Sequence, residues 1–147
     1  MDEIVKNLNV FLSDLAVFYR KLQNYHWNIK GKHFFVLHGK LEEYYDKINE
    51  QIDEIAEHIL MLGYEPLGTM KDYLEKTTIE EAKNEKVCDK VVFENLVEDY
   101  TILLQKANKI KRLSDESNSY ATSSMIDSFI SEYHKILWML KQSTNEN

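Results

Sequence analysis

The chain has 147 residues, of which 44% are hydrophobic and 29% are charged, and it carries a formal net charge of −7. This length is enough for one compact domain, and the composition is that of an ordinary globular protein. The longest apolar runs are only a few residues long, so the sequence predicts no membrane-spanning helix. The negative charge argues against general binding of nucleic acid, which depends on cationic side chains that neutralise phosphates.

Two further features favour a cytoplasmic location. Residues Met1–Ile4 lack the cationic region and apolar core of a secretory signal. The single cysteine, Cys88, allows no internal disulfide, which is typical of a reducing compartment. We therefore expect one domain over residues 1–147, located in the cytoplasm.

Apolar residues recur at alternating spacings of three and four along four segments, which is the period of one face of an α-helix. The segments run over residues 4–29, 34–62, 93–110 and 126–140. Asp2 and Asp89 are candidate N-caps, and Gly31 and Gly63 suit helix ends. No alternating strand pattern competes, so the sequence predicts an all-α protein with four long helices.

The connections between these predicted helices are unequal. The first two segments are joined by a short turn, as are the last two, so each pair is expected to form an antiparallel hairpin. The long crossover over residues 63–88 carries two patterns typical of capping boxes, Thr69-x-x-Asp72 and Thr78-x-x-Glu81. One long crossover favours a ferritin-like four-helix bundle, with a short extra helix between the second and third long helices. On architecture alone, any other four-helix protein remains the alternative.

Side chains of metal-ligand type lie in the first two predicted helices. His26 and His38 flank the glycine turn, and Asp53 and Glu57 follow within the second helix. Imidazole and carboxylate groups are ligands of iron and similar divalent metals. At about 100° per residue, both carboxylates and Glu42 share the helix face of His38. At about 1.5 Å per residue, however, His38 and Asp53 lie about 22 Å apart along the axis.

A metal–ligand bond is only about 2 Å long, so His38 cannot share an ion with the two distant carboxylates of its own chain. Either these groups serve different purposes, or a second, antiparallel copy brings its carboxylates to the histidines. A two-fold axis across the second helix would then create two equivalent sites in a dimer. His26 can reach His38 if the hairpin closes. The sequence contains no Glu-x-x-His pattern, which argues against a di-iron site inside one subunit.

The residues around these ligands form a recognisable pattern. It consists of Tyr25-His26-Trp27-Asn28-Ile29-Lys30-Gly31, Phe34-Phe35, Leu37-His38, Glu42, Asp53-Glu54-x-Ala56-Glu57, Leu62-Gly63 and Trp138-Met139-Leu140. The combination resembles the Dps proteins (DNA-binding proteins from starved cells), the twelve-subunit mini-ferritins, over almost the whole chain. The resemblance implies a hollow dodecamer that oxidises Fe(II), preferentially with hydrogen peroxide. It also implies that Fe(III) is stored inside, which protects against oxidative damage.

The resemblance also implies where the ferroxidase centre lies. It would sit at a two-fold interface, with His26 and His38 from one subunit and with Asp53 and Glu57 from its partner. The two partner carboxylates would hold the first iron together with the imidazoles. Glu42 would bind a second iron more weakly, directly or through water. Zinc or another divalent metal is expected to be able to replace iron in this centre.

The remaining histidines, His33, His58 and His134, are interpreted as structural. His58 is a departure from the family pattern, in which arginine usually follows this glutamate. Trp27 is expected beside the ferroxidase centre, either as a packing residue or as a trap for stray oxidising equivalents.

Iron entry is a further expectation from the resemblance. Family members take up iron through acidic pores at three-fold axes, lined from the end of the third long helix and the start of the fourth. Here that region holds Asp115, Glu116 and Asp127 among several serines. We expect Asp127 to line the pore.

DNA binding is expected to be weak or absent. Members that compact DNA commonly use a lysine-rich terminal tail, and neither end of this sequence supplies one. A dodecamer would carry about −84 (12 × −7), and this charge repels duplex DNA at physiological salt. Association with the nucleoid is the most we would expect.

The alternative function is that of a non-enzymatic helical shell, acting as a structural or host-cell-interacting protein. Family members from some pathogens act on host immune cells, so this class is real. A degenerate shell is expected to have lost at least one metal ligand, and the set here is intact. The sequence therefore favours the ferroxidase.

Overall fold

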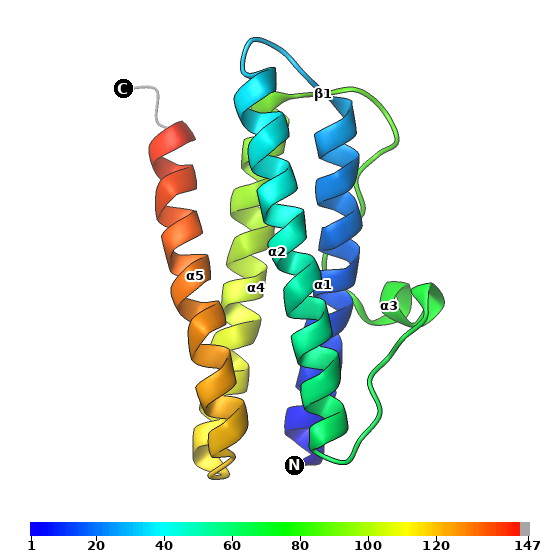
Figure 1. Ribbon diagram of the computed structural model, residues 1–147, viewed down its shortest axis with the longest axis vertical. Coiled ribbons are helices and arrows are strands. Elements are labelled where there is room, and N and C mark those ends of the chain that lie inside the picture. Colours follow the sequence, from blue (N-terminus) through cyan, green and yellow to red (C-terminus); the bar gives the residue numbers. More distant parts are fainter. Residues whose placement is uncertain (145–147) are drawn as a thin grey trace.

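Four long helices lie side by side along the longest axis of the molecule, and a short helix packs outside them (Figure 1). This is a computed structural model, and it describes residues 1–144. Its elements are α1 (Asp2–Asn28), β1 (Ile29–Lys30), α2 (Phe34–Met61), α3 (Met70–Lys76), β2 (Val87–Cys88), α4 (Asp89–Glu116) and α5 (Tyr120–Thr144). The predicted four long helices are confirmed, and the extra short helix, α3, lies in the long crossover as predicted. No helix among the described residues is long and apolar enough to cross a membrane.

Helices α1 and α2 form an antiparallel hairpin because a glycine allows the chain to reverse between them. Gly31 has a φ of 134°, which side chains other than hydrogen rarely permit, and its carbonyl accepts a hydrogen bond from the Phe34 amide at 3.2 Å. The hairpin places the end of α1 against the start of α2. This closure sets the geometry of the candidate site.

The crossover from α2 to α4 is held against α1 along its length. Thr69 caps α3, since its side chain accepts a hydrogen bond from the Asp72 amide, as the first capping pattern predicted. The second capping prediction was wrong, because residues 78–81 are not helical. Instead, the Thr78 amide donates to the buried carboxylate of Asp14 on α1 at 2.6 Å.

Two very short strands are an element that the sequence did not predict. β1 and β2 pair in parallel, with Ile29 opposite Val87 and Lys30 opposite Cys88. Two residues are too few to show an alternating apolar pattern. The pair ties the exit of α1 to the entry of α4.

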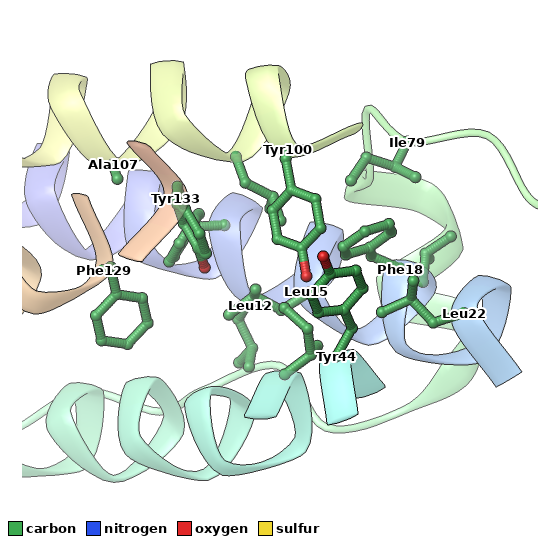
Figure 2. Packing of buried hydrophobic residues seen from close by; sticks show 14 of the residues in the cluster. Leu12, Leu15, Phe18, Leu22, Tyr44, Ile79, Tyr100, Ala107, Phe129 and Tyr133 are labelled. Atoms are coloured by element: carbon green, nitrogen blue, oxygen red, sulfur yellow. The ribbon is translucent and has the colours of Figure 1, made fainter. Parts of the chain in front are cut away.

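The core runs through the centre of the bundle and is rich in aromatic rings (Figure 2). The Tyr100 ring packs against Phe18 at 4.9 Å, Tyr44 at 5.6 Å and Tyr133 at 5.7 Å between centroids. The Tyr133 hydroxyl donates to the side-chain oxygen of Gln51 at 2.8 Å, which joins α5 to α2. The apolar stripes predicted from the sequence therefore face one another in the core.

Candidate metal centre

The rings of His26 and His38 lie face to face where the hairpin closes. Their centroids are 3.7 Å apart and their planes differ by 9°. His26 Nδ1 lies 2.6 Å from the main-chain oxygen of His38, and His38 Nδ1 lies 2.8 Å from the main-chain oxygen of His26. The structure therefore brings together the two histidines that the sequence predicted as ligands.

This reciprocal contact fixes which nitrogen of each ring carries the proton. A carbonyl oxygen only accepts hydrogen bonds, so each Nδ1 must be the donor. In the neutral imidazole, Nε2 then holds the free lone pair. Metal-binding histidines are commonly oriented by such a bond from the nitrogen that does not bind the metal. Both rings are thus prepared to coordinate a cation through Nε2.

Neighbouring aromatic rings hold the two imidazoles in place. Phe34 stacks on the His38 ring at 4.8 Å and 19°. The ring of Tyr45 meets His26 nearly edge-on, at 5.4 Å and 80°. His26 is only 6% exposed, so its orientation is restricted by packing as well as by its hydrogen bond.

Glu42 is the carboxylate nearest to this pair. Its Oε1 lies 3.6 Å from His26 Nε2, one helical turn beyond His38. The Glu42 side chain is 55% exposed, so it remains free to reorient toward a bound cation.

Asp53 and Glu57 do not join this cluster within the chain. Both are exposed on α2, and within residues 1–144 neither side chain makes a hydrogen bond or an ion pair. No three histidine, cysteine or acidic side chains in the described part of the chain converge closely enough to hold a metal ion. The placement of these two carboxylates opposite the histidines of another subunit remains a prediction.

The donor set itself fits a divalent transition metal. Two imidazole nitrogens with free lone pairs and a nearby carboxylate suit iron and zinc. Asp53 and Glu57 lie elsewhere on α2, and one chain cannot bring them to its own histidines. One chain alone therefore supplies the two imidazole nitrogens and the nearby Glu42 carboxylate.

The other histidines and Trp27 have different surroundings. His58 is buried, its Nε2 lies 2.8 Å from Thr122 Oγ1, and burial lowers the pKa of its imidazole. His33 Nε2 lies 3.9 Å from the Asp89 carboxylate at the surface. Trp27 is 56% exposed and, within the described chain, makes no ring contact with either histidine of the pair.

Sequence reasoning missed two features, one beside the histidine pair and one at the opposite end of the bundle (Figure 1). The contact of Tyr45 with His26 was not predicted, although the position of Tyr45 seven residues after His38 places both residues on one face of α2. The acidic group at the junction of α4 and α5 also contains a cation, because Lys111 Nζ lies 2.8 Å from Asp127 Oδ1 and 3.9 Å from Asp115 Oδ1. The role of Asp127 in iron entry remains a prediction, and its charge is partly neutralised.

Comparisons with known proteins agree with this architecture. The ferritin family model, which describes a ferritin-like domain, matches residues 5–146. A relative from Bacillus anthracis, named DNA protection during starvation protein 2, is 37% identical over 144 residues, which is 98% of each chain. The predicted ferritin-like bundle is confirmed.

Solved structures point to the same branch of the family. A Dps protein from Vibrio cholerae, described as a member of a broad superfamily of ferritin-like diiron-carboxylate proteins, has a TM-score of 0.95 and 35% identity. That match covers 98% of this chain and 90% of the other. A Dps from Listeria innocua that had been soaked with zinc has a TM-score of 0.90 and 32% identity, over 95% and 94% of the two chains. The fold and centre define a ferritin-like protein. Within that class, the chain belongs to the Dps family.

Proposed function

We propose that the protein is a mini-ferritin that oxidises Fe(II) and stores Fe(III). The observation that carries this proposal is the reciprocal hydrogen bonding of His26 and His38, which leaves both Nε2 atoms available beside Glu42. Membership of the Dps family, and the diiron-carboxylate description of the Vibrio cholerae relative, support iron as the substrate.

In this proposal the ferroxidase centre forms between two subunits. His26 and His38 bind one iron from one side, and Asp53 of the partner subunit and Glu57 of the partner subunit bind it from the other. Glu42 receives a second iron. A two-fold axis across α2 generates two such centres in each dimer, and the full assembly is a dodecamer.

The reaction that we propose uses hydrogen peroxide as the preferred oxidant. Two Fe(II) each lose one electron, the O–O bond breaks, and two protons are taken up, which gives two Fe(III) and two waters. The carboxylates stabilise the higher charge of the ferric product, since hard anionic oxygens favour the more charged ion. Because both electrons of the peroxide reduction come from iron at one centre, no hydroxyl radical is released.

Three further proposals concern ligands and location. Zinc competes with iron for the centre, which the zinc soak of the Listeria innocua relative makes reasonable to test. DNA binding is weak near neutral pH because the charge of −7 per chain repels phosphate. The protein acts in the cytoplasm.

The decisive experiment loads the metal-free protein with Fe(II) under anaerobic conditions and then adds a peroxide pulse. Ferric absorbance gives the rate, and light scattering gives the particle mass. Oxidation much faster than in the protein-free control, with iron retained in soluble particles of about twelve chains, supports the proposal. An intact shell that gives no acceleration contradicts it and favours the non-enzymatic shell.

Variants test the assignment of the histidines. His38→Ala should abolish the fast phase of oxidation while particle mass stays unchanged, because it removes one nitrogen donor from the hairpin surface. The exposed His134 on α5 provides the matched control, and His134→Ala should keep the fast phase. If His38→Ala breaks the assembly and leaves the oxidation rate unchanged, the role given to His38 is wrong.

A further inference from the structure

Helices α2 and α5 run antiparallel, and polar bonds hold them together near the middle of the bundle (Figure 1). The buried Gln51 amide of α2 donates to the Glu132 carboxylate at 2.8 Å and accepts from the Tyr133 hydroxyl at 2.8 Å, and both partners lie on α5. Between these bonds and the start of α2, two adjoining spaces open along the seam between the helices. None of the five proposed metal ligands lines either space, so the ferroxidase proposal leaves both unexplained.

The first space is an apolar hollow of about 170 Å³ between α2, α4 and α5. Its walls are formed by the buried side chains of Leu37, Leu41, Leu96 and Leu140. Its mouth is apolar too, because Val36 beside it is 73% exposed and Met139 is 37% exposed. Water finds few hydrogen-bonding partners among such side chains, so the hollow favours hydrocarbon as its occupant.

The second space is a groove of about 380 Å³ that continues along the same seam. It adjoins the hollow, because Lys40, Tyr44 and Met139 line both spaces. The cations Lys40, Lys47 and Lys135 stand at this groove, although the whole chain has 25 acidic side chains and only 18 lysines and arginines. The seam therefore joins an apolar interior to a rim that carries three ammonium groups.

The carboxylates at the groove leave one of these lysines available. Lys40 and Lys47 each lie near a glutamate three residues further along α2, at 3.7 and 3.6 Å. Glu132, which also lines the groove, is engaged by Gln51. Lys135 of α5 is exposed and makes no hydrogen bond or ion pair within residues 1–144. An anion in the groove would therefore pair with Lys135.

We propose that the seam between α2 and α5 binds one amphiphilic monocarboxylate of medium chain length. The alkyl chain lies in the hollow among the buried leucines, and the carboxylate lies in the groove beside Lys135. The ligand then covers apolar surface at the mouth, and its charge is complementary to the rim. A neutral amphiphile lacks the ion pair, and a lipid with two long chains is too large for a hollow of about 170 Å³. The proposal concerns binding alone and goes beyond iron oxidation.

The test is isothermal titration calorimetry of the assembled protein with hexanoate, octanoate and octan-1-ol, at concentrations below those at which octanoate forms micelles. Octanoate should bind saturably, with one molecule per chain, and more tightly than octan-1-ol. Each added methylene should tighten binding by about fourfold, so octanoate should bind about fifteenfold more tightly than hexanoate. Octanoate should also raise the melting temperature, because a ligand that binds only the folded state stabilises it.

Two variants separate the two parts of the site. Ser143 is exposed at the edge of the hollow, so Ser143→Phe should fill the hollow and abolish binding. Ser128 is another exposed serine of α5 and lines neither space, so Ser128→Phe is the matched control and should bind octanoate as the wild type does. Lys135→Met should weaken the binding of octanoate several-fold and leave that of octan-1-ol unchanged. Lys109→Met, at an exposed lysine of α4, is its control and should change neither.

The contrary outcomes are equally specific. The absence of saturable binding to the assembled protein, or a melting temperature that octanoate lowers, overturns the proposal. Binding that is equally tight in Ser143→Phe places the ligand elsewhere on the protein and overturns it too. An unchanged affinity for octanoate in Lys135→Met contradicts the role of the cationic rim. If Ser143→Phe does not assemble, the chain-length series on the wild type decides, since equal affinities for hexanoate and octanoate contradict an alkyl chain in the hollow.

Discussion

Lys21 of α1 and Asp99 of α4 form an ion pair at 2.8 Å, with side chains that are only 3% and 4% exposed. The pair joins the helix that carries His26 to the neighbouring long helix. Burial raises the pKa of the Asp99 carboxyl, while the hydrogen bond and charge of Lys21 act in the opposite direction. Asp99 therefore depends on Lys21 to remain charged without a large penalty.

Removing only the lysine should destabilise the protein strongly. Lys21→Met leaves the Asp99 carboxylate buried without its partner, and such changes typically cost about 3–5 kcal/mol. Thermal unfolding of the metal-free protein measures the loss. The double variant Lys21→Met, Asp99→Leu should recover most of it, because no charge is then left buried. Equal melting temperatures for the single and double variants would show that the charge is not the cause.

A second prediction concerns the attachment of the crossover to α1. Asp14 is fully buried and accepts hydrogen bonds from the Thr77 hydroxyl at 2.8 Å and the Thr78 amide at 2.6 Å. Asp14→Ala removes a charged acceptor, and hydrogen bonds to charged groups contribute about 1.5–3 kcal/mol each. We expect protease cleavage within residues 77–86 to become much faster, while α1 stays resistant. Asp2→Ala, which removes the exposed acceptor of the Tyr64 hydroxyl, is the control and should leave cleavage there unchanged.

A third prediction follows from the buried imidazole of His58. Burial lowers its pKa below the ordinary value of 6.5, and the charge of Glu54 opposes this only in part. The unfolded chain therefore binds a proton at a higher pH than the folded chain. The contribution of His58 to stability is therefore constant above the ordinary imidazole pKa of 6.5. It falls as the pH drops from 6.5 toward the lower pKa that His58 has in the folded chain.

Measurement of the melting temperature of the metal-free protein between pH 7.5 and pH 5 checks this. His58→Gln keeps a hydrogen-bonding partner for Thr122 Oγ1 and cannot titrate, so its melting temperature should fall less over the same interval. If the melting temperatures of the wild type and the variant fall in parallel, titrating groups other than His58 cause the loss of stability in acid.

The sequence predicted the helices because each long one keeps a single apolar stripe over many turns, which only a helix can bury. It also predicted that His38 and Asp53 of one chain cannot bind the same ion. The distance between two residues along a helix axis depends only on the number of residues between them. The reciprocal bonds between the histidines were not predictable. They depend on the register of α1 against α2, which Gly31 and the surrounding packing set together.

The wrong cap prediction at Thr78 and the unpredicted ion pair of Lys111 have the same physical origin. Thr78 has the local pattern of a helix cap, yet its amide is satisfied by Asp14, which lies 64 residues away in sequence. The Lys111 ion pair with Asp127 likewise joins two helices across a turn. Local patterns show which groups need partners, and tertiary contacts decide which partners they obtain.

Mixing two inactive variants tests whether the centre lies between subunits. One variant, His26→Ala with His38→Ala, lacks the nitrogen donors, and the other, Asp53→Ala with Glu57→Ala, lacks the carboxylates. Each alone should fail to oxidise Fe(II) rapidly.

In a mixed dimer, the histidines of the second variant face the carboxylates of the first, so one of its two centres is complete. With random co-assembly of equal amounts, about a quarter of the wild-type fast-phase amplitude should return, since half of the dimers are mixed and each has one working centre. Mixing the assembled shells without subunit exchange is the control and should restore nothing. If co-assembly also restores nothing, although mass spectrometry shows mixed dimers, the four residues do not act across the two-fold interface.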